Sequence, residues 1–364
     1  MKKIVRVFFV SIMLFSLVIL MTGCRIPMIG DSGPSMPSPV NRYEIGIMEY
    51  RDILLQRLGG FQKTDSYMSF PIAITTPDGC TVDMTGVTDE YVYEELYRLD
   101  KAIYGLKDDR KDYYQVINPN VIKNMNAVAS LWKSYGVQRN LYGTMTVKTS
   151  RYGPTMGLCR SEPFWEQTIG AFCTGFLISE DIVVTAGHCT STTSLQTCKI
   201  VFGYRMDSPT KVITTVPNQD VYGVKEVIAR KKTEDGLDFA ILRLDRKCNR
   251  TPLKLAQQDV KNGDYVYIIG YPVGLPIKYA DDARVVSVSG KYTFNALLDA
   301  YGGNSGSPVF NSRDEVVGIL VRGMPDFVTV GECRRSMMVP ISAEEYFGEF
   351  VTKISQFIEF IPSN

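Results

Sequence analysis

The sequence is poor in histidine and in net charge, and both shortages narrow its possible functions. His188 is the only histidine, and 40 basic residues against 39 acidic ones leave a formal net charge of +1. A zinc site draws on several ligands, for which one imidazole offers little. A balanced charge without a long basic run gives no field that would attract nucleic acid. We therefore expect no metal, no other cofactor and no nucleic-acid partner.

Long apolar runs are also scarce, and the clearest one lies at the start of the chain. The basic residues Lys2, Lys3 and Arg6 precede an apolar stretch over residues 7–21. This is the layout of a secretory signal, and the stretch is too short to span a bilayer comfortably. Residues 1–23 are therefore predicted to be a signal peptide that exports the protein.

Cys24 closes the segment Leu20-Met21-Thr22-Gly23-Cys24, which resembles a bacterial lipobox. In a lipobox the cysteine becomes the lipidated first residue, although Met21 stands where leucine is usual. Ordinary signal cleavage near Gly23 is the alternative. Residues 24–42 are polar and rich in proline, which predicts a tether. We expect a lipid anchor at Cys24 on a bacterial membrane, facing the periplasm or the exterior, or otherwise a secreted protein.

Three segments in the second half of the chain carry chemistry. His188 lies in Thr185-Ala186-Gly187-His188-Cys189, and Ser305 lies in Gly302-Gly303-Asn304-Ser305-Gly306-Ser307-Pro308. Between them, Asp238 opens an apolar run. A serine hydroxyl needs a base to take its proton, and that base needs a partner to hold its tautomer. Histidine, aspartate and serine in this order are one known solution.

These motifs resemble those of the chymotrypsin-like serine peptidases, most closely the bacterial trypsin-like branch that includes the glutamyl endopeptidases. The resemblance runs from about Phe172 to Pro340 and is weaker over residues 103–170. It implies a nucleophile, a general base, an orienting carboxylate and an oxyanion hole, carried respectively by Ser305, His188, Asp238 and the amides of Gly303 and Ser305.

Two alternatives to Asp238 lie nearby. Asp235 is in a turn-like segment and Asp245 follows the strand, so the position at the start of the apolar run favours Asp238. Asn304 stands where the trypsin branch has the aspartate that pairs with the mature amino terminus, which puts that activation mechanism in doubt. Segment 103–110 is similar to the start of mature glutamyl endopeptidases, and a plain charged turn is the alternative.

The resemblance places two charged residues in the specificity pocket. Asp299 precedes Ser305 by six residues, where trypsin has the aspartate that binds lysine or arginine, and it is otherwise a structural residue of the loop. Arg322 lies on the segment that forms a pocket wall, where it would neutralise Asp299 or meet an acidic substrate. His188 is committed to catalysis, which argues against reading glutamate through a pocket histidine. The balance favours basic residues before the scissile bond.

The chain contains eight cysteines, which suits an exported protein. Cys173 and Cys189 match the pair that staples the histidine loop in the family. Cys159–Cys198 is the preferred second bridge, although spacing alone does not give connectivity. The remaining candidates are Cys80, Cys248 and Cys333.

The pattern from residue 143 onward is all-β, with short apolar or alternating runs between turn-forming clusters. The predicted strands are 176–178, 182–185, 200–202, 212–216, 221–228, 239–244, 265–269, 284–288, 308–310 and 316–321. The family resemblance selects two packed antiparallel β-barrels, at about 143–250 and 251–342 within a peptidase domain over 143–364, with the site in the cleft between them.

Other segments predict helices and a small mixed N-terminal region. Residues 118–134 carry one apolar stripe of helical spacing. Ser342-Ala343-Glu344-Glu345 is a capping box that predicts a terminal helix over 343–361. Residues 43–142 are predicted to be an accessory domain or pro-region with a hairpin over 71–85, and a spacer is the alternative interpretation.

The predicted function is an exported, lipid-anchored serine endopeptidase that acts as a monomer on peptide or protein substrates. Acylation at Ser305 is followed by hydrolysis with a water activated by His188. The alternatives are a catalytically silent binding module or a serine esterase on the same scaffold, and an envelope scaffold lipoprotein.

Overall fold

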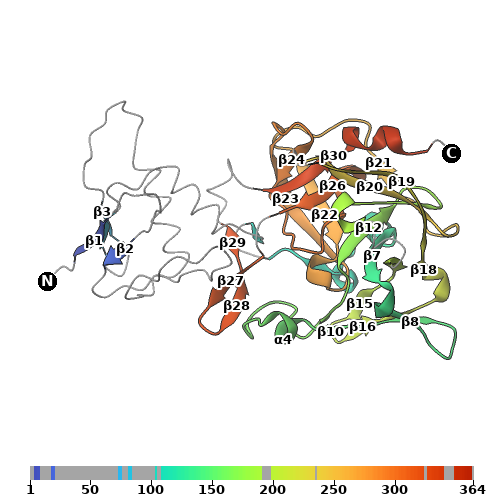
Figure 1. Cartoon of the computed structure of the whole chain (residues 1–364), viewed down its shortest axis with the longest axis horizontal. Coiled ribbons are helices and arrows are strands. Elements are labelled where there is room, and N and C mark those ends of the chain that lie inside the picture. The colour runs from blue at the N-terminus through green and yellow to red at the C-terminus, as the bar shows by residue number, and fades with distance from the viewer. Residues whose placement is uncertain are drawn as a thin grey trace. The chain divides into compact units, whose positions relative to one another are not determined.

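The computed structural model describes residues 4–8, 18–20, 73–75, 81–83, 103–104, 108–190, 198–233, 236–323, 326–339 and 348–362 (Figure 1). The chain divides into two compact units. One comprises residues 1–100 with 328–332, and the other comprises residues 101–327 with 333–364. The second unit contains all the residues proposed for catalysis.

The first unit is described only through four short strands that form one sheet. In sheet order they are β2 (Val18–Leu20), β1 (Ile4–Phe8), β4 (Thr81–Asp83) and β3 (Ala73–Thr75). β3 and β4 pair antiparallel, with Ala73 opposite Asp83, which confirms the predicted hairpin. Cys24, Cys80 and the tether lie outside the described residues. Among the residues described, no helix is long and apolar enough to cross a membrane.

The second unit holds a seven-stranded sheet built from the first half of the peptidase region. In sheet order its strands are β18 (Val221–Tyr222), β14 (Cys198–Phe202), β7 (Val128–Lys133), β12 (Cys173–Leu177), β13 (Ile182–Thr185), β20 (Asp238–Leu244) and β19 (Val224–Lys232). All neighbours in this sheet are antiparallel. β13 and β20 lie side by side, and this pairing positions the histidine loop next to Asp238.

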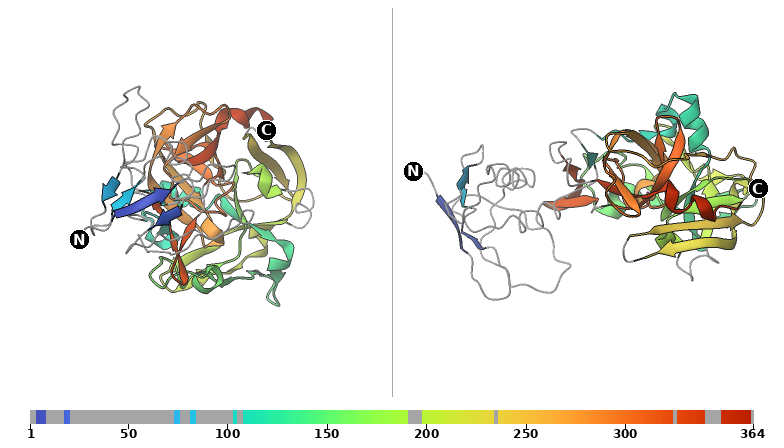
Figure 2. Two further views of the ribbon diagram at one scale, coloured as in Figure 1. Left: turned by 60° about the vertical axis from the view of Figure 1, so that its left-hand side comes forward. Right: turned by 90° about the horizontal axis from the view of Figure 1, so that it is seen from above.

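The second sheet closes on itself. Its strands run in the order β21 (Lys254–Leu255), β26 (Glu315–Arg322), β25 (Pro308–Asn311), β22 (Tyr265–Gly270), β23 (Lys278–Ser287), β24 (Thr293–Ala296) and β30 (Glu349–Lys353). An additional pairing of β26 with β30 completes the barrel, and β6 (Lys111–Asp112) adds to β23. The predicted all-β architecture is confirmed, and the two views of Figure 2 show both sheets from further directions.

Shorter elements connect and cover the two sheets. The helices are α3 (Pro119–Met125) and α4 (Tyr152–Met156), and the 3-10 turns are η1 (Tyr113–Gln115), η2 (Ser134–Gly136), η3 (Gly187–Thr190), η4 (Asn218–Asp220), η5 (Pro272–Gly274), η7 (Ile354–Gln356) and η8 (Ile358–Phe360). The remaining strands are β5 (Ile103–Tyr104), β8 (Val137–Arg139), β9 (Met145–Val147), β10 (Ser150–Arg151), β11 (Thr168–Ile169), β15 (Arg205–Ser208), β16 (Lys211–Ile213), β17 (Thr215–Val216), β27 (Phe327–Val330), β28 (Cys333–Ser336) and β29 (Met338–Val339).

Strand β22 shows why many runs in this sequence are apolar without alternation. Val266 and Ile268 belong to the core inside the closed barrel. Tyr267 and Ile269, on the opposite face, belong to the core shared with the first sheet. Successive side chains of a strand point to opposite faces. A strand buried on both faces is therefore apolar throughout, and the two sheets share one continuous core.

The helix predicted over residues 118–134 is wrong in its second half. α3 begins at its cap Asn118, whose side chain accepts a hydrogen bond from the Asn120 amide, and it ends at Met125. Residues 128–133 instead form β7, which lies between β12 and β14 and is buried along most of its length. Because every residue of this run before Lys133 is apolar or small, it fits a helical stripe and a buried strand equally well. The first sheet therefore begins before the predicted boundary at 143.

The predicted terminal helix over 343–361 is also wrong where the structure describes it. Residues 349–353 form β30, which pairs with β24 on one side and β26 on the other. Two 3-10 turns, η7 and η8, follow. The capping box at residues 342–345 lies outside the described residues. The edges of β24 and β26 provide hydrogen-bond partners on both sides of this segment. This pairing determines its structure more strongly than the helical spacing of its apolar residues.

Candidate active site

Strand pairing brings the histidine loop to Asp238. β13 leads directly into η3, which carries His188, and Asp238 is the first residue of β20. The two strands pair with Thr185 opposite Ala240. His188 Nδ1 lies 2.7 Å from Asp238 Oδ2, and the His188 amide donates to Asp238 Oδ1 at 3.0 Å. One carboxylate therefore fixes both the ring and the backbone of the histidine.

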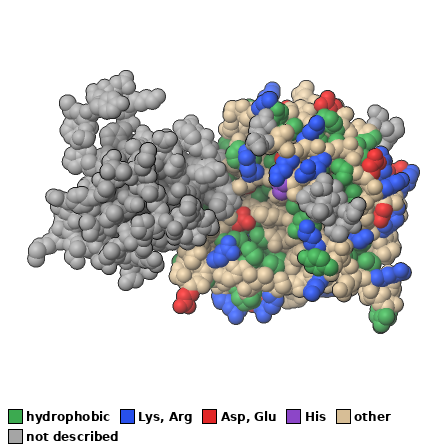
Figure 3. Space-filling model, in the orientation of Figure 1, with side chains coloured by type: hydrophobic (Ala, Val, Ile, Leu, Met, Phe, Trp, Pro, Cys, Tyr) green, Lys and Arg blue, Asp and Glu red, His purple; other side chains and the backbone are tan. Residues whose placement is uncertain are grey.

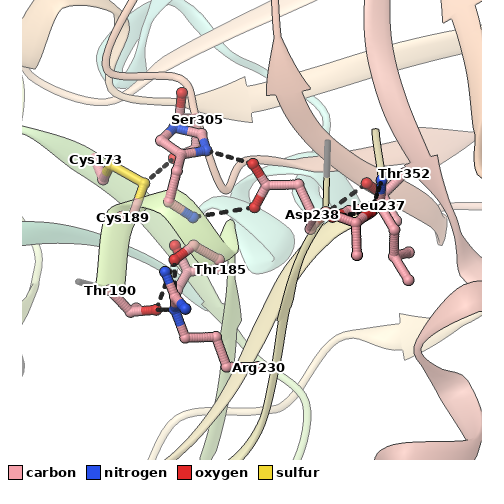
Figure 4. A network of polar contacts seen from close by, with 12 residues as sticks. Cys173, Thr185, Cys189, Thr190, Arg230, Leu237, Asp238, Ser305 and Thr352 are labelled. Atoms are coloured by element: carbon pink, nitrogen blue, oxygen red, sulfur yellow. Dashed lines mark hydrogen bonds and ion pairs between the residues drawn. A yellow bond between two sulfur atoms is a disulfide. The ribbon is translucent and has the colours of Figure 1, made fainter. Parts of the chain in front are cut away.

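Three neighbours hold this pair in place (Figure 4). The Thr352 hydroxyl donates to the backbone carbonyl of Asp238 at 2.9 Å, which ties the backbone of Asp238 to β30 of the other sheet. Arg230 Nε donates to the Gly187 carbonyl at 2.9 Å. The predicted disulfide Cys173–Cys189 is present and staples the loop beside the histidine. The imidazole remains 29% exposed, and Figure 3 shows the chain's single histidine at the surface.

The Ser305 loop is clamped against the first sheet. The Thr174 amide donates to the Ser305 carbonyl at 2.9 Å, and the Thr174 hydroxyl donates to the Gly303 carbonyl at 2.9 Å. Gly306 has a φ of +90°, and a Cβ on it would overlap the Thr174 carbonyl and the Thr185 hydroxyl. Only glycine allows this approach. The contact places Ser305 next to the strand that bears the histidine-loop disulfide.

The amides expected to form an oxyanion hole are available for that role. Among the described residues, neither the Gly303 nor the Ser305 amide donates a hydrogen bond to the protein. The Gly302 carbonyl accepts from the Val273 amide at 2.5 Å. Since a trans peptide directs its N–H opposite to its C=O, the Gly303 N–H points away from Val273. Two unoccupied donors around a nucleophile are what a tetrahedral oxyanion requires.

The hydrogen bond between the proposed nucleophile and the proposed base is the one contact of the triad that is not formed among the described residues. Within the part of the chain that the structure describes, no hydrogen bond joins the Ser305 hydroxyl to His188. Catalytic hydrogen bonds are often long in ligand-free enzymes and tighten when substrate binds. Of the two alternatives to Asp238, Asp245 accepts from the Gly223 amide and pairs with Arg246 instead. Asp235 lies outside the described residues.

Asn304 has a structural partner within the loop. It is buried, and its Oδ1 accepts a hydrogen bond from the Ser307 hydroxyl at 3.3 Å. Its amide donates to the Tyr301 carbonyl at 2.9 Å. The residue therefore stabilises the turn around the nucleophile from inside.

A pocket of about 310 Å³ opens beside Ser305. Residues of the nucleophile loop, of the end of β26 and of the start of β30 contribute to its lining. The lining residues are Tyr301, Gly302, Ser305, Leu320, Val321, Arg322, Gly323, Asp326 and Glu349. The predicted pocket residue Arg322 is among them. Asp299, which the sequence pattern also assigned to the specificity pocket, is not among these lining residues. The sequence analysis did not place Glu349 in this pocket, because it assigned residues 343–361 to a terminal helix.

Asp299 instead fastens the segment that precedes the first sheet. It is 5% exposed and accepts from the Tyr104 amide at 2.7 Å and the Asp109 amide at 3.1 Å. Burial and the neighbouring Asp109 carboxylate raise the pKa of Asp299 to about 9, against the opposing effect of the two amides. In the six-residue interval before Ser305, the backbone has turned this side chain away from the pocket and toward β5.

Two clusters have ligand types that metals use, and both have other partners. Cys173, His188 and Cys189 lie together, but the two cysteines form a disulfide. Asp108, Asp109 and Asp299 also lie within reach of one another. These carboxylates already receive the Arg110 guanidinium and backbone amides. The chemistry of the described site is thus that of serine, imidazole and carboxylate.

The second disulfide differs from the predicted one. Cys159 pairs with Cys333 across 174 residues of sequence. Cys198, the predicted partner, is a buried free thiol whose pKa burial raises to about 11. Cys198 lies on β14, where strand pairing places it opposite Lys133 of β7. The spacing of the cysteines along the sequence does not contain this information, so it did not predict which cysteine bonds to Cys159.

Sequence reasoning named the candidate triad but missed the residues that support it in the structure. Thr174, Thr352 and Gly187 act through backbone contacts that appear only when the strands are paired. Thr174 precedes a glycine in an apolar strand, and nothing in that context distinguishes it from an ordinary strand threonine. The only available signal for Gly187 was its position immediately before the histidine.

Comparison with known proteins adds a family match. Residues 173–319 match the family model described as a trypsin-like peptidase domain. Exfoliative toxin A of Staphylococcus aureus is 30% identical over 158 residues, which are 40% of this chain and 54% of that protein. The chain thus spans about half the length of this curated relative.

Solved structures that match the chain include the following three. A Glu endopeptidase in complex with MPD aligns with a TM-score of 0.43 and 17% identity, covering 70% of this chain and 96% of that one. An inactive mutant of Rv3671c from M. tuberculosis H37Rv gives 0.38 and 17%, covering 67% and 89%. The VesB protease of Vibrio cholerae gives 0.41 and 13%, covering 70% and 66%. Scores at this level carry no functional conclusion.

Proposed function

We propose that this chain, whose residues 173–319 match a trypsin-like peptidase domain, is an active serine endopeptidase that hydrolyses peptide bonds through Ser305, His188 and Asp238. The observation that carries the proposal is the His188 Nδ1–Asp238 Oδ2 contact of 2.7 Å beside a nucleophile loop with two free amides. In this scheme His188 takes the Ser305 proton as the hydroxyl attacks the scissile carbonyl. The oxyanion is held by the Gly303 and Ser305 amides, and His188 returns the proton to the leaving amine.

A water molecule then completes the reaction. His188 removes one of its protons while its oxygen attacks the acyl-enzyme carbonyl, and the proton passes to Ser305 as the ester bond breaks. Asp238 keeps the imidazole in one tautomer and stabilises its charged form through both steps. Every group that the reaction needs belongs to this chain or is water. Substrates are extended peptide segments, with a preference for basic residues before the scissile bond.

The test of this function is cleavage of an unstructured protein such as reduced casein. The full exported chain should release peptides, and Ser305→Ala should not. Ser289→Ala, a change of an exposed serine just after β23, is the matched control and should keep full activity. Absence of cleavage by the intact protein, with normal folding, supports the silent binding module instead. Hydrolysis of simple esters without peptide cleavage supports the esterase.

Export and lipid anchoring through Cys24 complete the proposal. The supporting features are the sequence of residues 1–24 and a disulfide-stapled fold, since disulfides persist in oxidising compartments. Expression in a bacterial host with radiolabelled palmitate should label the wild-type chain in the membrane fraction. Cys24→Ala should remain unlabelled. Palmitate labelling that survives this change would contradict the anchor.

A further inference from the structure

We propose that the hairpin over residues 136–148 is a membrane-docking element, whose tip enters the surface of an anionic phospholipid bilayer. The hairpin joins β8 to β9, and none of its residues belongs to the proposed triad or lines the pocket beside Ser305. Figure 1 shows the chain after β8 projecting from the second unit. This contact with the membrane is additional to the proposed lipid anchor and does not depend on it.

Exposed apolar side chains are concentrated in and next to this hairpin. Among the described residues, the exposed large hydrophobic side chains are Tyr114, Ile117, Tyr135, Leu141, Tyr142, Val227, Tyr265 and Val330. Five of these eight lie between residues 114 and 142. At the hairpin tip Leu141 is fully exposed and Tyr142 is 93% exposed, and Tyr135 before the hairpin is 77% exposed. Adjoining apolar side chains left in water mark an interaction site.

The tip is held in one conformation by Asn140. Its Oδ1 accepts hydrogen bonds from the Tyr142 amide at 3.0 Å and from the Thr144 amide at 3.2 Å. Its backbone carbonyl accepts from the Gly143 amide at 3.1 Å. Gly143 has a φ of +78°, which the tight turn requires. The turn therefore presents Leu141 and Tyr142 to a partner with little further loss of backbone freedom on binding.

The charge of this part of the chain is of one sign. Residues 113–161 contain no aspartate or glutamate, although the whole chain is balanced. The basic residues of the segment are Lys123, Lys133, Arg139, Lys148, Arg151 and Arg160. Arg151 and Arg160 both pair with Glu166, just outside the segment. Arg139 and Lys148 are exposed, and no carboxylate among the described residues pairs with either of them.

These two cations adjoin the apolar side chains. Arg139 Nη2 lies 3.9 Å from the position of a Cβ built on Gly143, so the guanidinium lies against the turn. Lys148 is at the other end of the hairpin, where its amide donates to the Gly136 carbonyl at 2.7 Å, next to Tyr135. An anionic bilayer matches this pattern, because its acyl region receives leucine, its headgroup level favours tyrosine, and its phosphates attract cations.

Other partners match only part of this surface. Sites for small molecules are concave, whereas a hairpin tip is convex. A soluble polyanion such as a nucleic acid would neutralise the cations, but its phosphates offer nothing to the side chain of Leu141. A bilayer provides the apolar region and the negative charge together, so we assign it as the partner.

The test uses the full exported chain with Cys24→Ala, so that no acyl chain contributes to binding. This protein should sediment with vesicles of phosphatidylcholine and phosphatidylglycerol, and much less with vesicles of phosphatidylcholine alone. Leu141→Ser combined with Tyr142→Ser should lower the partition coefficient by roughly 10-fold or more, because two apolar side chains no longer leave water. Arg139→Gln combined with Lys148→Gln should lower it by roughly 10-fold at low salt.

Matched controls change the same kinds of residue elsewhere. Tyr265→Ser removes another exposed tyrosine and Lys261→Gln another exposed lysine, both at or near the start of β22. Each should leave the partition coefficient unchanged. Thermal unfolding of every variant checks the fold. Because vesicle binding is measured without catalysis, a failure of the proposed peptidase activity would leave this test valid.

A second measurement follows the tip itself. The environment-sensitive dye nitrobenzoxadiazole, attached to Tyr142→Cys, should brighten and shift its emission to the blue when vesicles containing phosphatidylglycerol are added. The same dye on Lys261→Cys should not respond. The free cysteines Cys198 and Cys248 are buried, and the parent chain treated with the dye gives the blank.

Loss of binding in the two hairpin variants, with both controls unchanged, supports the proposal. Absence of binding to vesicles that contain phosphatidylglycerol overturns it. Equal binding to vesicles without that lipid also overturns it, since the proposed partner is anionic. Binding that survives the changes of Leu141 and Tyr142, or a dye at position 142 that stays in water while the protein is bound, contradicts insertion of the tip and leaves only attraction of a polyanion.

Discussion

Gly306, the residue after the nucleophile, is a position where the site requires a residue without a Cβ. Its φ of +90° lies in the left-handed region, and a Cβ there would overlap the Thr174 carbonyl and the Thr185 hydroxyl. Gly263 has a similar φ of +84°, but no atom lies within 4 Å of a Cβ built on it. The two glycines therefore share the conformational requirement and differ in the need for space.

We predict that Gly306→Ala lowers kcat/KM by more than 100-fold, because the Ser305 loop must move away from Thr174 and lose its position beside the histidine. Gly263→Ala should cost only about 1–2 kcal/mol of strain in stability and leave kcat/KM close to wild type. Peptide cleavage and thermal unfolding of both variants check this. Equal activity in the two variants would contradict the proposed clamp.

Asp299 gives a prediction about pH, because burial and Asp109 raise its pKa to about 9. Its proton is held more tightly in the folded than in the unfolded protein, where the pKa is about 3.9. Asp299 therefore stabilises the fold least at high pH, and stability should fall as the pH rises from about 4 toward 9.

We predict that Asp299→Asn flattens this dependence, since the amide has no proton to lose. The free energy of unfolding from urea titrations at pH 5, 7 and 9 measures it. Asp282→Asn changes a nearby exposed carboxylate and should retain the wild-type slope. A slope that is the same in all three proteins would show that Asp299 is ionised throughout the range.

At the residue scale, the sequence indicates the proposed catalytic residues because their motifs are local. Ser305 and His188 each lie in a short segment whose glycines indicate a sharp turn or a close approach of the backbone. The position of Glu349 in the pocket lining could not be predicted in this way, since it depends on the pairing of β30 with β24 and β26. The direction of Asp299 was equally hidden, because it depends on the docking of Tyr104.

At the scale of elements, the predicted strands were recovered. The helix predicted over 118–134 was recovered only in its first half, and the terminal helix was not recovered where the structure describes it. Strands such as β13 and β20 are short apolar runs bounded by turns, which is a local signal. β7 and β30 are strands only because open edges of other strands lie beside them. Local periodicity does not contain that information.

Strand β6 is a second element whose place is tertiary, and it carries a buried ion pair. Asp112 Oδ1 lies 2.5 Å from Lys278 Nζ, with side-chain exposures of 4% and 2%. The neighbouring pair, Lys111 and Asp281, joins the same two strands on the surface at 2.9 Å, with exposures of 43% and 37%. Burial lowers the pKa of Lys278 to about 8, and Asp112 opposes that shift.

We predict that Asp112→Ala lowers the free energy of unfolding by roughly 3–5 kcal/mol, because it leaves a buried ammonium without its partner. Asp281→Ala should change it by about 0–1 kcal/mol, as is usual for exposed pairs. Urea unfolding at pH 7 compares the two. A small effect of Asp112→Ala would mean that Gln167 and the Pro276 carbonyl, which also accept from Lys278, suffice.

At the scale of the whole molecule, the site exists where the two sheets meet. His188 and Asp238 come from the first sheet, Ser305 precedes β25 of the second, and Thr352 of β30 returns to Asp238. The fold class and this division followed from the strand pattern and the family motifs. The Cys159–Cys333 bridge and the docking of residues 103–112 did not, since both join segments far apart in sequence.

The most direct test of the central claim is to map the site of covalent labelling by a fluorophosphonate. Phosphonylation of a serine requires a base that removes its proton and amides that stabilise the oxyanion. Mass spectrometry of the digested wild-type protein should find one adduct, on Ser305, and His188→Ala should lose it while remaining folded. A folded wild-type protein without an adduct, or with its adduct on another serine, would contradict the account.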